Sequence, residues 1–72
     1  MPRLPQVSGR ALVHLLHSLG YETLRQRGSH IRLKKGNLSV TVPIHPGDLS
    51  QTVLRSTLRQ AHLIPEEFLK LL

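Results

Sequence analysis

The chain has 72 residues, the size of one small domain. A domain this short buries roughly 60% of the surface that its unfolded chain exposes, so its core has to be efficient. It contains no cysteine, which excludes disulfides and thiolate metal sites and fits a reducing compartment. Ten Lys or Arg residues face four Asp or Glu residues, for a net charge of +6. Such a charge favours polyanionic partners: nucleic acid, an anionic membrane surface or an acidic protein.

A helix is predicted over residues 9–19, after an extended lead-in over residues 1–7 in which two prolines oppose helix. Ser8 is a suitable N-cap, and Val7 before it can pack on the fourth helical residue as a hydrophobic staple. Gly20 suits a left-handed C-terminal cap. One face of this helix carries the apolar residues Ala11, Leu12, Leu15, Leu16 and Leu19.

Three short strands are predicted next, over residues 21–27, 30–35 and 38–42. Two-residue turns that begin with glycine separate them, and the third strand stops at Pro43, which cannot donate to a central ladder. These strands form an antiparallel meander. In the second strand, alternation places Ile31 on one face of the sheet, so that face is apolar and the other is basic and wet.

A loop over residues 44–48 leads to a second helix at about residues 51–61, with Ser50 as its cap. Pro65 fits the first position of a short last helix. The residues expected in the core from these two helices are Leu49, Val53, Leu54, Leu58, Ala61, Phe68, Leu69, Leu71 and Leu72. The predicted fold is α+β, in the order αβββα(α), with the helices packed on one face of a three-stranded antiparallel sheet. Double-stranded RNA-binding domains share this layout, which is an analogy of fold only.

Basic residues concentrate in the predicted hairpin. Half of the Lys and Arg residues lie within eleven positions that hold no acid, namely Arg25, Arg27, Arg32, Lys34 and Lys35. One interpretation is a solvated hairpin that keeps the protein soluble, and the other is a surface that binds a polyanion. We expect a soluble, cytoplasmic protein without membrane contact, because the N-terminus has no apolar run of signal-peptide length and no stretch approaches the roughly 20 apolar residues of a membrane span.

The residues permit few kinds of phosphodiester chemistry. Metal-dependent cleavage needs clustered carboxylates or a His/Asp ligand set, and the chain has four scattered acids: Glu22, Asp48, Glu66 and Glu67. His14 and His17 are three residues apart on the first helix but lack the surrounding pattern of a zinc site, so we interpret them as exposed polar residues. We therefore expect neither a metal nor any small-molecule cofactor.

RNA cleavage without a metal needs less, because the 2′-hydroxyl of the substrate is the nucleophile. Histidine suits the proton transfer, and Arg and Lys suit the phosphate. His30 is the candidate for the proton transfer, because it shares a strand face with Arg32 and Lys34. Whether Arg25 and Arg27 on the preceding strand lie beside it depends on the register of the two strands. A plain phosphate contact by His30 is the alternative. Because Tyr21 and Phe68 are the only aromatic residues, recognition should depend on phosphate and sugar contacts.

The chain resembles the HicA (YcfA-like) family of mRNA interferase toxins from prokaryotic HicA–HicB toxin–antitoxin systems. The segments that carry the resemblance, in chain order, are Leu4-Pro5, Val7-Ser8-Gly9, Leu19-Gly20-Tyr21, Arg25-Gln26-Arg27-Gly28-Ser29-His30, Val40-Thr41-Val42-Pro43-Ile44-His45, Leu54-Arg55-Ser56, Leu58-Arg59-Gln60-Ala61 and Glu66-Glu67-Phe68. No short piece is decisive, and their order and spacing in a chain of this length make the resemblance specific.

The resemblance implies a double-stranded RNA-binding-like fold and a metal-independent endoribonuclease acting on mRNA, with growth arrest when the toxin is free. It implies that His30 is the catalytic residue and that a HicB-type antitoxin neutralises the protein. The predicted substrate-binding residues are Arg25, Arg27, Gly28, Ser29, Arg32 and Lys34. His45 matches a family pattern, as a second proton-transfer or phosphate group or as a loop hydrogen-bonding residue.

Two positions depart from the family pattern. Thr52-Val53 stands where many members have Gly-Thr, and His62 stands where many have Gly. Both departures lie in or beside the second helix, away from His30. They therefore put the boundary of that helix and the docking of the antitoxin in question more than the catalytic assignment of His30. Two other functions stay open on the residues alone: a non-catalytic RNA-binding module, and a protein whose basic face docks an acidic protein partner.

Overall fold

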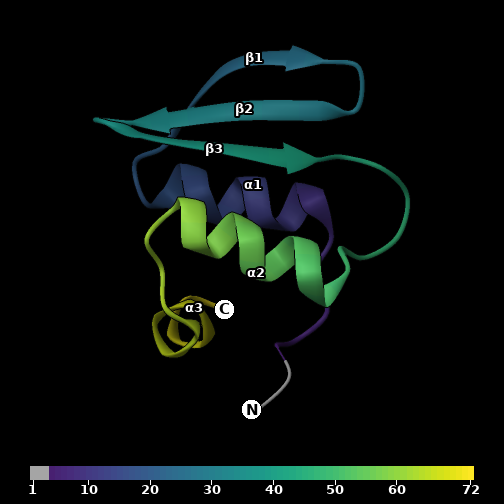
Figure 1. The fold of residues 1–72 in the computed structure, drawn as a ribbon, viewed down its shortest axis with the longest axis vertical. Helices are drawn as coiled ribbons and strands as arrows, with labels where there is room; N and C mark the ends of the chain where they lie inside the picture. The colour runs from purple at the N-terminus through teal and green to yellow at the C-terminus, as the bar shows by residue number, and fades with distance from the viewer. Residues whose placement is uncertain (1–3) are drawn as a thin grey trace.

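A computed structural model of the chain describes residues 4–72 and contains three helices and one three-stranded sheet (Figure 1). The elements in chain order are α1 (Gly9–Ser18), β1 (Glu22–Arg27), β2 (His30–Lys35), β3 (Leu38–Pro43), α2 (Gln51–Gln60) and α3 (Pro65–Leu71). The predicted α+β fold is confirmed, with boundaries within one residue of those expected for the first two helices and the strands. The first three residues of the predicted lead-in lie outside the described part of the chain.

Serine caps begin the two longer helices as the sequence predicts. The Ser8 hydroxyl accepts a hydrogen bond from the Ala11 N–H at 3.1 Å, and the Ser50 hydroxyl accepts one from the Val53 N–H at 3.1 Å. Each cap satisfies a backbone donor that the first helical turn leaves without a partner. The residues before α1 are also held in place, because the Gln51 side-chain amide both donates to and accepts from the Leu4 backbone.

Glycine ends α1 in the way its position predicts. Gly20 has a φ of +101°, and its N–H donates to the His17 carbonyl at 3.0 Å. The Tyr21 N–H donates to the Leu16 carbonyl, also at 3.0 Å. This pair of bonds is a Schellman motif, in which the left-handed residue turns the chain out of the helix. The helix itself therefore stops at Ser18, one residue before the predicted end.

The same motif ends α2, although no glycine is present there. His62 has a φ of +57°, its N–H donates to the Arg59 carbonyl at 3.1 Å, and the Leu63 N–H donates to the Leu58 carbonyl at 2.9 Å. Histidine is one of the few non-glycine residue types that enter this region with some frequency. The departure from the family pattern at this position therefore keeps the helix end and changes only the residue that makes it.

The sheet has the order β1-β2-β3 with both pairs antiparallel. β2 pairs with β3 without interruption, from His30 opposite Pro43 to Lys35 opposite Leu38. β1 carries an irregularity between Thr23 and Arg25, where one extra residue enters the strand. Such a bulge shifts the register of every residue that precedes it.

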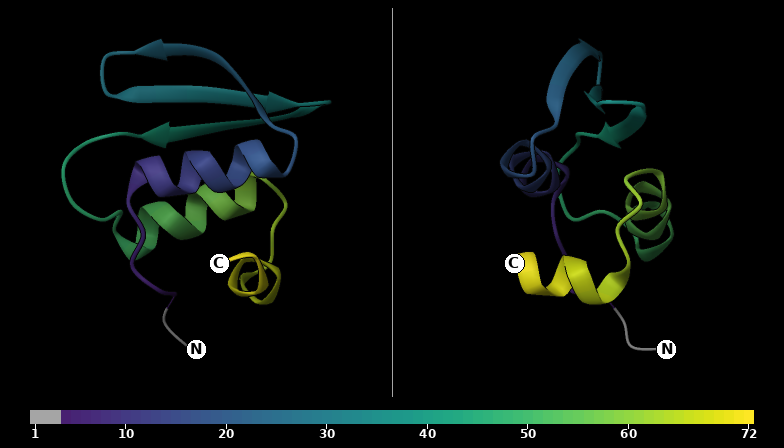
Figure 2. Two further views of the ribbon diagram at one scale, coloured as in Figure 1. Left: turned by 180° about the vertical axis from the view of Figure 1, so that it is seen from behind. Right: turned by 90° about the vertical axis from the view of Figure 1, so that its left-hand side faces the viewer.

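The helices cover one face of β2 and β3 and leave β1 largely uncovered (Figures 1 and 2). Every residue of β1 is exposed, whereas Leu33, Val40 and Val42 of the other strands are fully buried. The core residues are Leu4, Leu12, Val13, Leu15, Leu16, Tyr21, Leu33, Val40, Val42, Leu49, Leu54, Leu58, Ala61 and Phe68. β1 is thus held by its ladder to β2 and by one side-chain hydrogen bond between Thr23 and α1, and it lies beyond the packed layers.

Contact between α1 and β3 is unusually close at one point. A Cβ atom added to Gly9 would overlap the Pro43 carbonyl oxygen. Only glycine lets the first turn of this helix approach the strand backbone so closely. The contact fixes the start of α1 against the end of β3, which lies beside the start of β2.

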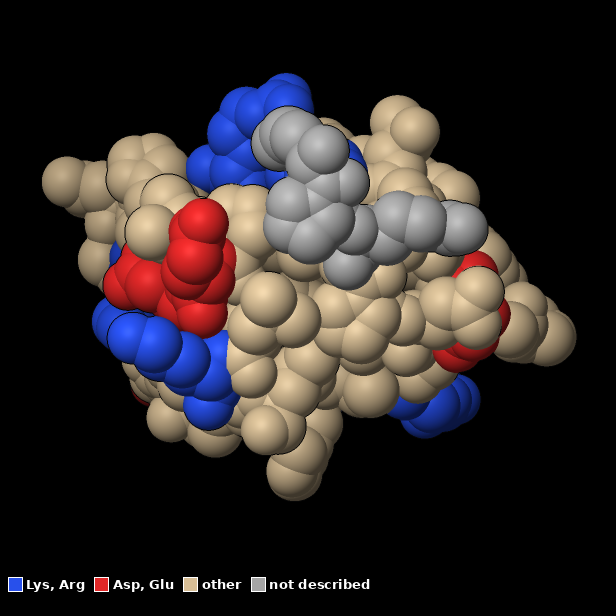
Figure 3. All heavy atoms as spheres, turned by 90° about the horizontal axis from the view of Figure 1, so that it is seen from below, with Lys and Arg blue, Asp and Glu red and all other residues tan. Residues whose placement is uncertain are grey.

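Three predicted core leucines are not in the core. Phe68 of α3 is fully buried, but Leu69, Leu71 and Leu72 are 46%, 43% and 60% exposed. α3 crosses beneath the other two helices and has no further layer under it (Figure 2). The face seen from below is mostly uncharged in its middle, with charged side chains at its margins (Figure 3). Ala11, also predicted in the core, is exposed, and Val13 is buried in α1 instead.

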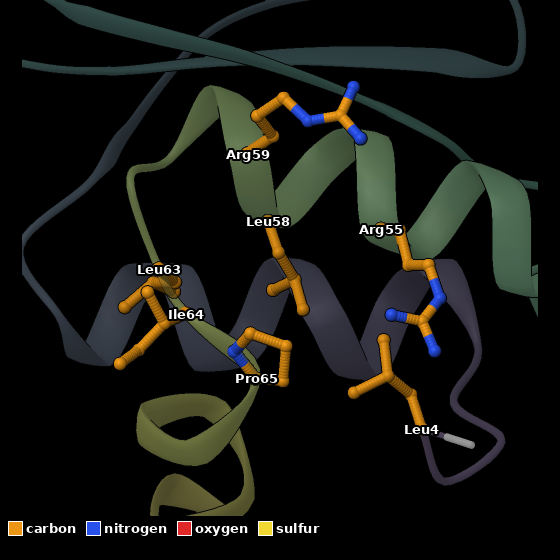
Figure 4. Close-up of a pocket in the computed structure, with 7 residues that line it drawn as sticks. All are labelled: Leu4, Arg55, Leu58, Arg59, Leu63, Ile64 and Pro65. Carbon is orange, nitrogen blue, oxygen red and sulfur yellow. The ribbon is translucent and has the colours of Figure 1, made fainter. Parts of the chain in front are cut away.

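A shallow hollow of about 310 Å³ lies between α2 and the segment that enters α3 (Figure 4). Its lining residues are Leu4, Arg55, Leu58, Arg59, Leu63, Ile64 and Pro65. It is therefore on the helical side of the molecule, away from the basic strands. Within residues 4–72, none of the helices has the length and apolar character that a membrane crossing requires.

Candidate nucleic-acid and catalytic site

The turn before His30 is held from both sides. Gly28 has a φ of +58°, and its carbonyl accepts a hydrogen bond from the Gln26 side-chain amide at 3.3 Å. The Ser29 carbonyl accepts a hydrogen bond from the Ile44 N–H, which extends the β2–β3 ladder by one position. The turn that the sequence predicts at Gly28 and Ser29 is therefore present, and these hydrogen bonds fix where β2 begins.

His30 is the first residue of β2 and lies opposite Arg27 on one side and Pro43 on the other. Its side chain is exposed, on the sheet face that points away from the helices. Directly opposed residues on neighbouring antiparallel strands have Cβ atoms roughly 4.5–5.5 Å apart, so the Arg27 guanidinium and the imidazole can reach one phosphate. Among residues 4–72, no side chain forms a hydrogen bond or ion pair with the imidazole.

Arg25 lies directly opposite Arg32 on the same sheet face. Like charges that face each other across strands destabilise a sheet. Arg32 is also oriented from the other side, since its Nε donates to the Ser39 hydroxyl at 3.1 Å. The two facing guanidinium groups repel each other, and their arrangement suits an anionic ligand that bridges them.

The predicted basic residues therefore gather on one surface. We call it the basic face, made of Arg25, Arg27, His30, Arg32 and Lys34. Glu22 lies opposite Lys34 at its far end. A hollow of about 480 Å³ on this face is lined by Leu24, Arg25, Arg32, Lys34, Asn37 and Ser39.

Leu24 is the residue that sequence reasoning missed. Simple alternation along β1 places it on the helix side with Gln26, but the bulge puts it beside Arg25 in the hollow of the basic face, 55% exposed. An exposed leucine among cations offers apolar contact to a sugar or base edge. The signal in the sequence is weak, because β1 has no clear apolar alternation from which a bulge could be recognised.

Lys35 belongs to the other side of the sheet. Its Nζ lies 5.8 Å from the centre of the Tyr21 ring, a cation–π distance. Tyr21 is buried, and burial raises the pKa of its phenol. The last cation of the hairpin therefore packs on the domain rather than joining the basic face.

The other histidines lie away from the basic face. The His17 Nε2 is 2.8 Å from the Thr23 hydroxyl, and His14 is exposed on the same helix. The His45 Nδ1 is 3.3 Å from the Pro46 carbonyl oxygen, as its interpretation as a loop hydrogen-bonding residue predicts. In the part of the chain that the structure describes, no three His, Asp or Glu side chains come together as a metal ligand set.

Comparison with known proteins gives one decisive match. A family model described as the HicA toxin of bacterial toxin–antitoxin systems matches residues 9–63. The chain belongs to the HicA toxin family. It is therefore a toxin of a toxin–antitoxin system and has an antitoxin as its partner. No curated protein sequence gives a significant match.

The HicA match covers α1, the sheet and α2, and it ends at Leu63, before α3. It includes both departures noted from the sequence. Thr52 is exposed and Val53 is partly buried against the core, so α2 accommodates both residues. The basic face and the turn before His30 lie wholly inside the matched region.

Proposed function

We propose that this HicA toxin is a metal-independent endoribonuclease that cleaves mRNA, with His30 as its catalytic residue. The observation that carries the proposal is the basic face: an exposed imidazole stands opposite Arg27, and Arg32 and Lys34 follow along the same strand. The family match supports it, because HicA toxins are RNA-cleaving toxins.

The reaction needs one proton transfer at each of two oxygens. The 2′-hydroxyl loses its proton and its oxygen bonds to the adjacent phosphorus, while the bond from phosphorus to the 5′-oxygen breaks and that oxygen gains a proton. His30 serves as the general base or the general acid, since imidazole changes charge near neutral pH. Arg27, opposite His30 on β1, and Arg32, two residues further along β2, stabilise the charge that develops on the phosphate oxygens.

The basic face also suits binding of RNA ahead of any reaction. Phosphate contacts come from its cations Arg25, Arg27, Arg32 and Lys34. The Gly28-Ser29 turn lets the RNA strand approach the start of β2. With aromatic residues buried at Tyr21 and Phe68, base stacking is not available on this face. We therefore expect weak sequence preference and a steep dependence of affinity on salt.

We further propose that the antitoxin is of the HicB type and that it neutralises the toxin. A proteinaceous inhibitor with carboxylates can match the cations of the basic face. Co-expression with a HicB-type protein encoded beside the toxin gene should restore growth. Growth arrest that persists in the presence of that protein contradicts this assignment.

A specific observation favours a second candidate function, a non-catalytic RNA-binding module. No side chain within residues 4–72 orients the His30 ring, whereas an activated general base is usually held by a further group. Catalytic hydrogen bonds often form only in the complex with substrate, so the geometry without RNA is compatible with both functions.

The deciding experiment compares His30→Ala with Arg32→Ala. Catalysis by His30 predicts that His30→Ala lowers cleavage by roughly 10²–10⁴-fold while RNA binding changes little. Arg32→Ala should weaken binding and cleavage together. The readouts are growth and mRNA integrity after induction, with purified protein and RNA as the in vitro counterpart, and chelator should not change the cleavage rate.

Circular dichroism checks that both variants stay folded. A folded His30→Ala protein that is as toxic as the wild type shows that His30 is not catalytic. RNA binding without cleavage by the wild-type protein, with a His30→Ala loss no larger than that of Arg32→Ala, establishes the binding module instead.

A further inference from the structure

Three side chains that the proposed reaction does not use form a row along α1. Arg10, His14 and His17 are four and three residues apart, which places them on one face of the helix. All three are exposed. The opposite face of α1 carries the core leucines, so the row marks the solvent side of the helix.

This row is one wall of a groove. A hollow of about 220 Å³ is lined by Arg10, Val13, His14, His17, Ile31 and Ile44. Its two isoleucines, Ile31 and Ile44, are half-buried. The hydrogen bond between the His17 imidazole and the Thr23 hydroxyl joins α1 to β1 at one end of the row.

The groove continues toward the turn that precedes His30. A second hollow of about 370 Å³ shares Arg10 and Ile44 with the first and adds His45 among its lining residues. The Ile44 N–H donates to the Ser29 carbonyl, one ladder position beyond the pairing of His30 with Pro43. The two hollows, which we call the α1 groove, therefore begin beside the turn before His30 and end at His17.

The chemistry of the α1 groove selects an anionic chain. Among the described residues that line it are one arginine and three histidines, and no Asp or Glu. Arginine and imidazole N–H groups are donors that suit phosphate oxygens, and the isoleucine floor suits the carbon atoms of a sugar.

We infer that the α1 groove is a second RNA-binding site, which holds the phosphate backbone of the single strand that runs away from His30. Arg10 makes the central phosphate contact, because it lines both hollows. The inference rests on the proposed function, since it extends the same substrate past the basic face. It gives His45 and His14 a role in binding, distinct from proton transfer.

The test measures equilibrium binding of a single-stranded RNA of about 16 nucleotides, near the upper site size of small single-strand binding domains. All proteins carry His30→Ala to prevent cleavage. Arg10→Gln is compared with Lys70→Gln, which removes the same charge from the exposed surface of α3, and with Arg25→Gln on the basic face. Affinity falls as salt rises, and each loss of a phosphate contact should lower the magnitude of the slope of log affinity against log salt by about 0.7.

We expect Arg10→Gln to lower this slope by about 0.7 and Lys70→Gln to leave it unchanged. His14→Gln is the second variant in the groove and should weaken binding without changing the fold. Equal slopes for Arg10→Gln and Lys70→Gln overturn the inference. If Arg25→Gln alone lowers the slope, RNA binds to the basic face and not to the α1 groove. If neither arginine variant lowers the slope, the proposed RNA-binding function fails as well.

Discussion

Replacing Arg25 with glutamine should make the protein more stable and weaken its binding of RNA. Arg25 and Arg32 face each other across β1 and β2, with both side chains on the exposed basic face. Their mutual repulsion opposes folding, whereas their joint attraction for a phosphate favours binding. Glutamine keeps most of the length of the side chain and removes its charge, so the two effects should appear together in one variant.

The size of the stability gain follows from the geometry. A cross-strand charge pair changes stability by roughly 0.2–1 kcal/mol, with the sign set by the charges. In a domain of this size, that corresponds to a rise in melting temperature of about 1–8 °C. The repulsion should be screened in 1 M salt, where the Debye length is about 3 Å, compared with about 10 Å at 0.1 M.

Thermal denaturation of Arg25→Gln and wild-type protein at both salt concentrations measures the effect. The variant should melt at the higher temperature in low salt, and the difference should shrink in 1 M salt. Binding of RNA in the His30→Ala background should show the opposite order. A variant that melts below the wild type, or a difference that salt does not change, refutes the argument that charge repulsion at this pair is retained for binding.

Three further changes test other parts of the structure. His62→Gly should raise the free energy of unfolding by about 0.5–1 kcal/mol, because glycine removes the strain of a left-handed residue at the end of α2. Urea denaturation measures this change, and a loss of stability would show that the His62 side chain stabilises the fold. Gly9→Ala should lower the free energy of unfolding by roughly 1–3 kcal/mol through its overlap with the Pro43 carbonyl, and an unchanged urea midpoint would mean that α1 shifts freely. Burial raises the pKa of Tyr21, so the folded state holds the phenolic proton more tightly; this contribution to stability is complete below the ordinary pKa near 10 and is lost as the pH rises above it. Tyr21→Phe should therefore reduce the alkaline fall in stability measured by denaturation between pH 9 and 12, and identical pH profiles for both proteins would rule this out.

The composition of the basic face could be predicted from the sequence, but its pairing could not. Alternation in β2 puts His30, Arg32 and Lys34 together on any register, since Leu33 must enter the core. Whether Arg25 faces Arg32 depends on the bulge in β1. β1 lacks a buried face, so no apolar pattern in the sequence fixes its register.

The last helix shows a different limit of sequence reasoning. Phe68, Leu71 and Leu72 have a spacing typical of one helical face, and only Phe68 is buried. Burial there depends on how many layers the domain has, and α3 is already the outermost one (Figure 2). Periodicity indicates which residues share a face but not whether a partner covers that face.

The uncovered position of β1 also determines how the protein should fluctuate. Opening β1 breaks one ladder and exposes little of the core, whereas opening β3 separates the sheet from the helices. We therefore expect the amide hydrogens of β1 to exchange with solvent faster than those of β3, through local opening rather than global unfolding. Because β1 carries Arg25 and Arg27, RNA can bind tightly only while this strand is docked, so bound RNA should slow exchange in β1. The strand that contributes two cations of the basic face is thus the element whose order the ligand itself would reinforce.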